Sequence, residues 1–202
     1  MRDMQAEAGA PLISPPSPTQ EPTGRPSRRP RLFAVLIAAA VVVYAADQLA
    51  KAWALAHLQP DVPQDLLGPV LRLDLTRNPG AAFSIATSAT WVLTLIAAAV
   101  VVVIIVTSRR LGSLGWAWAL GLLLGGSLGN LTDRMVRPPG VGRGHVVDFL
   151  MLPHWPIFNV ADSAIVSAAV LIGLLAVRGV SIDGSRTQPH APKHEAGAHT
   201  DA

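Results

Sequence analysis

Five polar residues between positions 130 and 162 have the types and the spacing needed for chemistry. Asn130 and Asp133 lie three residues apart at the end of one apolar run, and Asn159 and Asp162 repeat that spacing at the start of the next. Asp148 lies between the two pairs, in the sequence Val-Val-Asp-Phe. Carboxylates beside apolar runs long enough to cross a bilayer are costly to keep there. Each of these aspartates is therefore a candidate functional group.

Two carboxylates held close together could hydrolyse a peptide bond. Like charges a few ångströms apart do not both ionise easily, so such a pair shares one proton. The ionised member takes a proton from water while the protonated member polarises the scissile carbonyl. Residues at i and i+3 share a helix face, and the matching Asn-x-x-Asp spacing alone favours Asp133 with Asp162. Helix capping and ion pairing are the structural alternative, because Asn and Asp are common at helix ends.

Other chemistries have little support in the sequence. The chain has no cysteine, which excludes thiol nucleophiles, disulfides and cysteine-ligated metals. His57, His145 and His154 form no His-x-x-x-His pair and accompany no serine in an elbow context. The chain carries a formal charge of +3, but no basic patch is interleaved with aromatic residues. We therefore expect no metal site and no nucleic-acid binding.

Four apolar runs must position these polar residues. Half of the residues are hydrophobic, 14% are charged and the mean hydropathy is +0.41, which is typical of a membrane protein. We predict membrane-spanning helices over residues 32 to about 58, 90–106, 116–131 and 158–177. Several glycines in the third run would let neighbouring helices approach closely.

The segment between the first two runs is too polar to span a membrane. Residues 70–77 alternate between apolar and polar, the period of a half-exposed strand, and Asn78-Pro79-Gly80 then predicts a turn. The expected fold is an all-α membrane protein with four transmembrane helices and a small extracytoplasmic β-rich loop subdomain.

Arginines predict the orientation of the four helices. They precede the first run, separate the second from the third as Arg109-Arg110, and follow the fourth as Arg178. Basic residues are enriched in cytoplasmic connections, so both termini are expected in the cytoplasm. Asp47 and Lys51, which can pair at i,i+4, then fall near the outer end of the first helix. With Asn78 in the outer loop, all of these polar residues converge on the outer face.

The predicted domain organisation has a membrane domain between two tails. Residues 1–31 are Pro- and Arg-rich and residues 179–202 are polar, and neither composition can bury a core, so both are expected to be disordered cytoplasmic tails. Residues 32–178 form the membrane domain. A small transporter or proton relay remains an alternative, although it would predict internal repeats and broken helices, and neither is evident. A lipid-binding scaffold without catalysis is a third hypothesis.

Five short motifs occur in order along the membrane domain. They are Asp47-Gln48-x-x-Lys51, Asn78-x-Gly80-Ala81-Ala82-Phe83-Ser84, Gly125-Gly126-x-x-Gly129-Asn130-x-x-Asp133-Arg134, Val147-Asp148-Phe149 and Phe158-Asn159-x-Ala161-Asp162-Ser163. Together they closely resemble the lipoprotein signal peptidases (signal peptidase II) of bacteria, over residues 32 to 178. The resemblance implies an intramembrane aspartyl protease that cleaves prolipoproteins just before the cysteine that carries diacylglycerol. It also implies no cofactor, sensitivity to globomycin, contact with membrane lipid and a location in the bacterial cytoplasmic (inner) membrane. We expect a monomer.

The resemblance changes the choice of the acid pair. The family's catalytic dyad falls on Asp148 and Asp162, whereas Asp133 has Arg134 and Arg137 nearby and can be held as an ion pair. Asp148 lies in an apolar run, where burial would raise its pKa. Asp162 is expected near a helix N-terminus, whose dipole favours an anion. Our hypothesis is that Asp162 is ionised and Asp148 carries the proton.

The remaining matched positions have implied supporting roles. Residues that orient the dyad or contact the substrate backbone are Asn78, Asn130, Arg134 and Asn159. Residues that give structural polar support are Asp47, Gln48, Lys51 and Asp133. The connection over residues 137–144 is longer than expected for the family, which leaves its reach over the site open.

Overall fold

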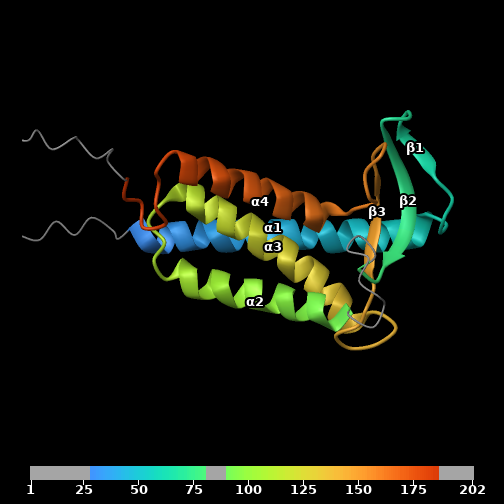
Figure 1. The fold of residues 1–202 in the computed structure, drawn as a ribbon, viewed down its shortest axis with the longest axis horizontal. Helices are drawn as coiled ribbons and strands as arrows, with labels where there is room; N and C mark the ends of the chain where they lie inside the picture. The colour runs from blue at the N-terminus through green and yellow to red at the C-terminus, as the bar shows by residue number, and fades with distance from the viewer. Residues whose placement is uncertain (1–27, 81–89, 187–202) are drawn as a thin grey trace, which may run out of the picture.

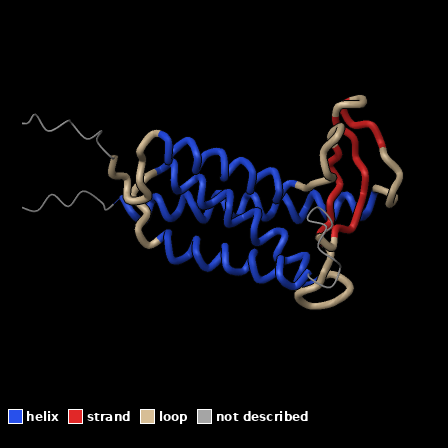
Figure 2. Tube along the Cα trace, viewed as in Figure 1, coloured by secondary structure: helices blue, strands red, loops and turns tan. Residues whose placement is uncertain are grey.

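The computed structural model describes residues 28–80 and 90–186, which form four helices and three strands. Figures 1 and 2 show the helices side by side, with the sheet at one end of the bundle. The elements in chain order are α1 (Arg28–His57), β1 (Gln64–Leu67), β2 (Leu71–Asn78), α2 (Thr90–Ser108), α3 (Leu114–Val136), β3 (Val146–Met151) and α4 (Val160–Val177).

The four predicted spans correspond to the four helices. Within the described residues, all four helices are long and apolar enough to cross a membrane. Many of their large apolar side chains face outward, as expected for helices surrounded by lipid rather than water. The first helix begins at Arg28, so residues 28–31 of the predicted tail are helical. The motif residues 81–84 and the rest of the two predicted tails, residues 1–27 and 187–202, lie outside the described residues.

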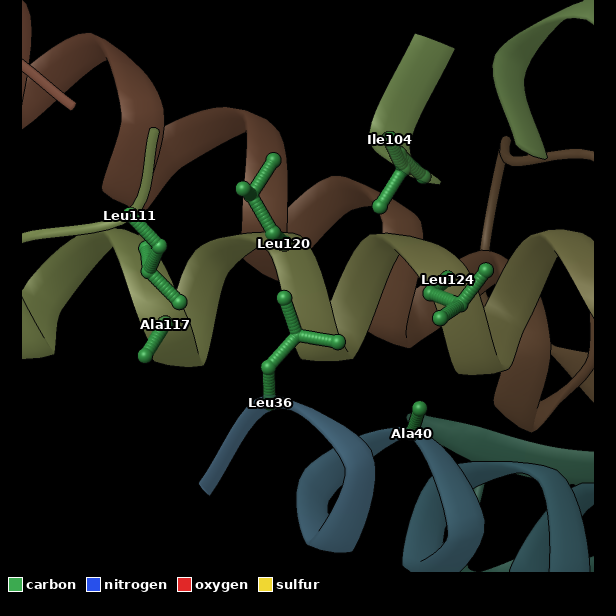
Figure 3. Packing of buried hydrophobic residues seen from close by; sticks show 7 residues of the cluster. All are labelled: Leu36, Ala40, Ile104, Leu111, Ala117, Leu120 and Leu124. Atoms are coloured by element: carbon green, nitrogen blue, oxygen red, sulfur yellow. The ribbon is translucent and has the colours of Figure 1, made fainter. Parts of the chain in front are cut away.

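Helix α3 is the centre of the bundle and packs against α1, α2 and α4. Glycine allows two of these close approaches. A Cβ atom on Gly125 would lie 2.6 Å from the carbonyl oxygen of Ala40, and one on Gly126 would lie 2.6 Å from that of Ala161. Buried apolar side chains from α1, α2, α3 and the connection between α2 and α3 then fill the interface (Figure 3), namely Leu36, Ala40, Ile104, Leu111, Ala117, Leu120 and Leu124.

The strands form an antiparallel sheet in the order β1-β2-β3. The alternating pattern predicted β2, whereas the strands β1 and β3 were not predicted. Figure 1 shows that α1 extends beyond the other helices to reach this sheet. There the C-terminal end of α1 and the residue after it pack against one face of the sheet, in a cluster of Ala54, Leu58, Leu73, Leu75, Val147 and Phe149. The sheet is therefore fixed to the helix bundle by a hydrophobic core of its own.

The start of α1 and the end of α4 lie at the same end of the bundle, opposite the sheet (Figure 1). Residues 179–186 follow α4 and were expected to belong to the disordered tail. Instead, Gly112 N donates to Ile182 O at 2.9 Å, and Trp116 Nε1 donates to Val180 O at 2.9 Å. These bonds join the end of α4 to the start of α3.

Candidate active site

The fold brings Asp148 and Asp162 to the end of the bundle beside the sheet. Asp148 is in the middle of β3, where Thr76 of β2 is its register partner. Successive side chains of a strand point to opposite faces. Val147 and Phe149 therefore pack against α1, while Asp148 faces the cavity between the helices. Asp162 is in the first turn of α4.

Asp148 is 1% exposed and has two amide donors. Asn159 Nδ2 donates to its Oδ1 at 2.6 Å, and Asn78 Nδ2 donates to its Oδ2 at 2.9 Å. Gly80 N donates to Asn78 Oδ1 at 2.7 Å, which orients the Asn78 amide toward the acid. Burial, and then the nearby charge of Asp162, raise the pKa of Asp148 from 3.8 to about 7 despite these hydrogen bonds.

Asp162 belongs to the cap of α4. Asn159 Oδ1 accepts from Asp162 N at 2.9 Å, and Asn159 N donates to Asp162 Oδ2 at 3.2 Å, which completes a capping box. Asn130 Nδ2 donates to the other carboxylate oxygen, Oδ1, at 2.8 Å. The capping alternative for Asn159 is therefore correct, and the same side chain also binds Asp148 through Nδ2.

Both acids line one cavity of about 600 Å³. Its polar wall includes Asn78, Asn130 and Arg134, and the rest is largely apolar, from Leu93, Ile96, Ala97, Val100, Leu123, Ile157, Phe158 and Ile165. Arg134 is 8% exposed, and its buried Nη1 has no hydrogen-bond partner in residues 28–80 and 90–186. The cavity thus places two carboxylates and an unsatisfied guanidinium nitrogen at the end of an apolar chamber.

A second polar cluster surrounds Lys51, which contacts the cavity-lining residue Asn130. Its Nζ is 2.8 Å from Asp47 Oδ2 and 2.9 Å from Asp133 Oδ2, and all three side chains are fully buried. Gln48 Nε2 donates to Asp47 Oδ2 at 3.0 Å and to Gly129 O at 3.2 Å. The predicted i,i+4 pair of Asp47 and Lys51 is confirmed.

Asp133 belongs to the cluster around Lys51 and does not line the cavity. Arg137 Nε lies 2.5 Å from Asp133 Oδ1, as expected for an ion pair. Arg134, the other arginine expected beside Asp133, lines the cavity instead. The contact between Lys51 and Asp133 was not predicted, because it depends on how α1 and α3 are aligned.

All ten candidate residues therefore gather at one end of the bundle, in two connected clusters: the polar residues around the dyad and the cluster around Lys51.

Sequence reasoning missed two buried threonines at the start of α2. Thr90 Oγ1 donates to Pro79 O at 2.9 Å and Thr94 Oγ1 to Gly142 O at 2.8 Å. A polar residue in an otherwise apolar span was the available signal. The second bond anchors the long 137–144 connection on α2, and none of its residues lines the cavity.

The arrangement defines a class: a membrane protein whose described residues form four apolar helices, with a buried and a partly buried carboxylate on a shared cavity. The sequence model of the family described as Signal peptidase (SPase) II matches residues 39–178. The chain belongs to the signal peptidase II family. It is therefore a peptidase and a multi-pass protein of the bacterial inner membrane.

Known relatives agree with this assignment. The chain is 49% identical over 173 residues to the lipoprotein signal peptidase of Rhodococcus jostii, covering 86% of this chain and 83% of the relative. It is 48% identical over 167 residues to that of Mycobacterium avium, covering 81% and 92%. A solved structure of a bacterial membrane enzyme at 1.9 Å resolution matches with a TM-score of 0.62 and 26% identity, over 72% of this chain and 94% of that one.

Proposed function

We propose that the chain is an aspartic endopeptidase that removes signal peptides from diacylglyceryl-modified prolipoproteins, cleaving just before the lipidated cysteine. The relatives are named lipoprotein signal peptidases. The observation that carries the proposal is the shared environment of Asp148 and Asp162. They line the same cavity, and Asn159 binds both of them, through its side-chain and backbone nitrogens.

Asp162 is the ionised member of the proposed dyad. Hydrogen bonds from Asn130 Nδ2 and Asn159 N favour its carboxylate, as does the N-terminal dipole of α4. Asp148 carries the proton, because its pKa of about 7 keeps a substantial protonated fraction near neutral pH. Since the two acids interact, pH titration would report values that belong to the pair.

The proposed reaction begins with a water molecule between the two carboxyl groups. The water oxygen attacks the scissile carbonyl while Asp162 accepts a proton from the water, and Asp148 gives its proton to the carbonyl oxygen. The tetrahedral intermediate then collapses, and Asp162 passes its new proton to the leaving amine while Asp148 regains its own. The dyad returns to its starting state, and no cofactor is needed for any step.

The charges around the dyad are consistent with one shared proton. The acids of these two clusters are Asp47, Asp133, Asp148 and Asp162, and the basic side chains are Lys51, Arg134 and Arg137. One proton on the dyad therefore makes the whole group neutral. Neutrality matters here, because an uncompensated buried charge costs several kcal/mol in a protein interior.

The cavity supports a lipid-modified peptide as substrate. Its apolar walls come from α2, α3, α4 and residues 155–158, and they suit the hydrophobic part of a signal peptide and acyl chains. Asn78 and Arg134, at the polar end, are placed to contact the peptide backbone. Arg134 Nη1 supports this role, because a buried donor without a partner is costly until it gains one.

We place this active site at the outer face of the membrane, with both termini in the cytoplasm. The arginines at the start of α1, between α2 and α3 and after α4 all lie at the end of the bundle opposite the sheet, which supports this orientation. The proposed enzyme acts as a monomer, since both acids and their partners come from one chain.

Cleavage of a defined substrate tests the proposed activity. Purified protein should release the signal peptide from a prolipoprotein that carries diacylglycerol, and globomycin should block the release. The same prolipoprotein without the lipid is the matched control and should stay intact. Equal cleavage with and without the lipid would contradict the proposed specificity, and no cleavage of either would contradict the function.

A further inference from the structure

Lys51 is a buried cation that the proposed reaction does not use. Its side chain is fully buried near the outer end of α1, where an unpaired ammonium would cost several kcal/mol. Its Nζ has three acceptors: Asp47 Oδ2 at 2.8 Å, Asp133 Oδ2 at 2.9 Å and Asn130 Oδ1 at 3.0 Å. The two aspartates already balance the charge, so the bond to Asn130 has no role in neutralising Lys51.

The side-chain amide of Asn130 has an oxygen that accepts and a nitrogen that donates, and the contact with Lys51 determines which of them points toward the dyad. A lysine ammonium can only donate hydrogen bonds, so the amide oxygen of Asn130 must point toward it. The amide nitrogen then points the other way and donates to Asp162 Oδ1 at 2.8 Å. In the flipped orientation the amide NH₂ would meet the ammonium, and the amide oxygen would meet the Asp162 carboxylate.

Asn159 assists this orientation only in part. Its Nδ2 lies 3.1 Å from Asn130 Oδ1, but also 2.6 Å from Asp148 Oδ1 and 3.4 Å from Val147 O. An amide nitrogen has two hydrogens, so it cannot serve three acceptors fully. Lys51 has three hydrogens for three acceptors. Its bond is therefore the stronger determinant of how the Asn130 amide is turned.

We infer that Lys51 is a positioning residue for catalysis: its ammonium fixes the Asn130 amide so that Asn130 donates to Asp162, and its positive charge acts on the proton equilibrium of the dyad. The inference rests on the proposed function of Asp148 and Asp162. It goes beyond structural support of α1, because it links the buried cluster to the chemistry through one identified amide.

The charged groups around Lys51 come from every element that packs near it. Asp47 shares α1 with it, Asp133 and Arg134 lie on α3, and Arg137 follows α3. Asp162 lies on α4 beyond Asn130, and Asp148 lies on β3. The positive charge of Lys51 lowers the pKa of Asp148 and so opposes the effect of burial on that carboxyl group. Removing the charge should therefore move the pH profile of cleavage upward.

Steady-state kinetics of Lys51→Met in the full-length protein test this role. We expect kcat to fall about 10- to 100-fold, the range for losing an oriented hydrogen bond to a charged group. KM should stay within about twofold, since Lys51 does not line the cavity. The pH profile of kcat should shift toward higher pH. A profile and a kcat like those of the wild type would overturn the inference.

Gln48→Leu is the matched control for a purely structural effect. Gln48 also ties α1 to α3, through Gly129 O, and within the described residues its side chain donates to Asp47 and Gly129 rather than to Asn130. This variant should lower the melting temperature and leave the pH profile unchanged. A loss of kcat in both variants without a pH shift in Lys51→Met would show that Lys51 acts only through stability.

A double variant covers the case in which Lys51→Met does not fold, since that change leaves Asp47 and Asp133 undercompensated. Asp47→Asn with Lys51→Met keeps the net charge unchanged, and Asn at position 47 still offers an oxygen to Ala161 N, which now donates to Asp47 Oδ1 at 2.9 Å. The loss of kcat at constant KM should persist, because Asn130 still lacks its donor. Full kcat in this variant would overturn the inference, whereas an inactive wild type would instead overturn the proposed function.

Discussion

At the scale of single residues, Asp148 acquires its raised pKa from its position in β3. The strand places the carboxyl group in a buried site that faces Asp162, and two asparagine amides only partly offset the cost of its charge. Folding therefore favours the protonated form. This arrangement has consequences for stability as well as for activity.

The pKa of Asp148 predicts how stability depends on pH. The folded value of about 7 lies above the ordinary 3.8, so the unfolded chain loses this proton at lower pH than the folded chain does. The contribution of Asp148 to the free energy of unfolding is fully present below pH 3.8. It is lost between pH 4 and 7, by roughly 2–4 kcal/mol. Asp148→Asn should remove this decline. Melting temperatures of both proteins from pH 5 to 8 measure it, and parallel curves would contradict it.

Asn159 combines two functions that substitution can separate. Serine is as good an N-cap as asparagine, but its side chain carries no amide to bind Asp148. Asn159→Ser should therefore lose cleavage by about 10- to 100-fold with a small loss of stability. Asn159→Ala should lose a further ~1 kcal/mol, because the cap is lost too. Kinetics and melting temperatures of the two variants check this, and equal stability would show that the cap contributes nothing.

Some of these residue contacts could be predicted from the sequence. The Asp47–Lys51 and Asn159–Asp162 pairs follow from helical spacing and are present. The Lys51–Asn130 bond could not be predicted, since it joins residues 79 positions apart and requires the alignment of α1 on α3. Choosing Asp148 over Asp133 depended on family resemblance, because spacing alone favoured Asp133.

At the scale of elements, close packing of α3 determines where the polar clusters meet. A Cβ atom on Gly125 would lie 2.6 Å from Ala40 O and 2.7 Å from Val43 Cβ, so α1 and α3 would have to separate. Lys51 and Asn130 are carried on these same two helices. The alignment of the buried cluster therefore depends on glycine packing in the third helix.

Two alanine substitutions test this dependence. Gly125→Ala should destabilise the protein by about 1–3 kcal/mol through overpacking and should also lower kcat. Gly173→Ala in α4 is the matched control, because its added Cβ would have nothing within 4 Å. There the better helix propensity of alanine should stabilise slightly, by up to about 1 kcal/mol. Thermal unfolding compares the two, and an unchanged melting temperature for Gly125→Ala would contradict the packing account.

The elements differed in how well the sequence predicted them. Long apolar runs identified all four helices, and alternation identified β2. The strand β3 was missed because Val146 to Phe149 are buried on both faces, so the polar–apolar alternation of a half-exposed strand is absent. Residues 179–186 were missed because backbone bonds to the start of α3, rather than apolar side chains, hold them.

At the scale of the whole molecule, the sheet and the chain ends mark opposite ends of the bundle. The proposed orientation puts the sheet outside the cell membrane. Because the chain has no cysteine, single cysteines can report sidedness without interference. Val70→Cys lies in the exposed connection between β1 and β2, and Arg186→Cys lies at the opposite end.

A thiol reagent that does not cross membranes should label these two variants differently. In intact cells Val70→Cys should react and Arg186→Cys should not, whereas both should react after lysis. Labelling of Arg186→Cys alone in intact cells would reverse the proposed orientation. It would also move the active site to the cytoplasmic face.

Cleavage of a diacylglyceryl-modified prolipoprotein by purified variants shows whether Asp148 and Asp162 together perform the hydrolysis. Asp148→Asn and Asp162→Asn should each lower kcat by at least about a thousandfold, as expected when one member of a catalytic unit is removed. Both should remain inserted and folded, while Asp61→Asn, an exposed control, should cleave like the wild type. Activity that survives Asp148→Asn but is abolished by Asp133→Asn in a folded protein would contradict the account and assign the chemistry to Asp133.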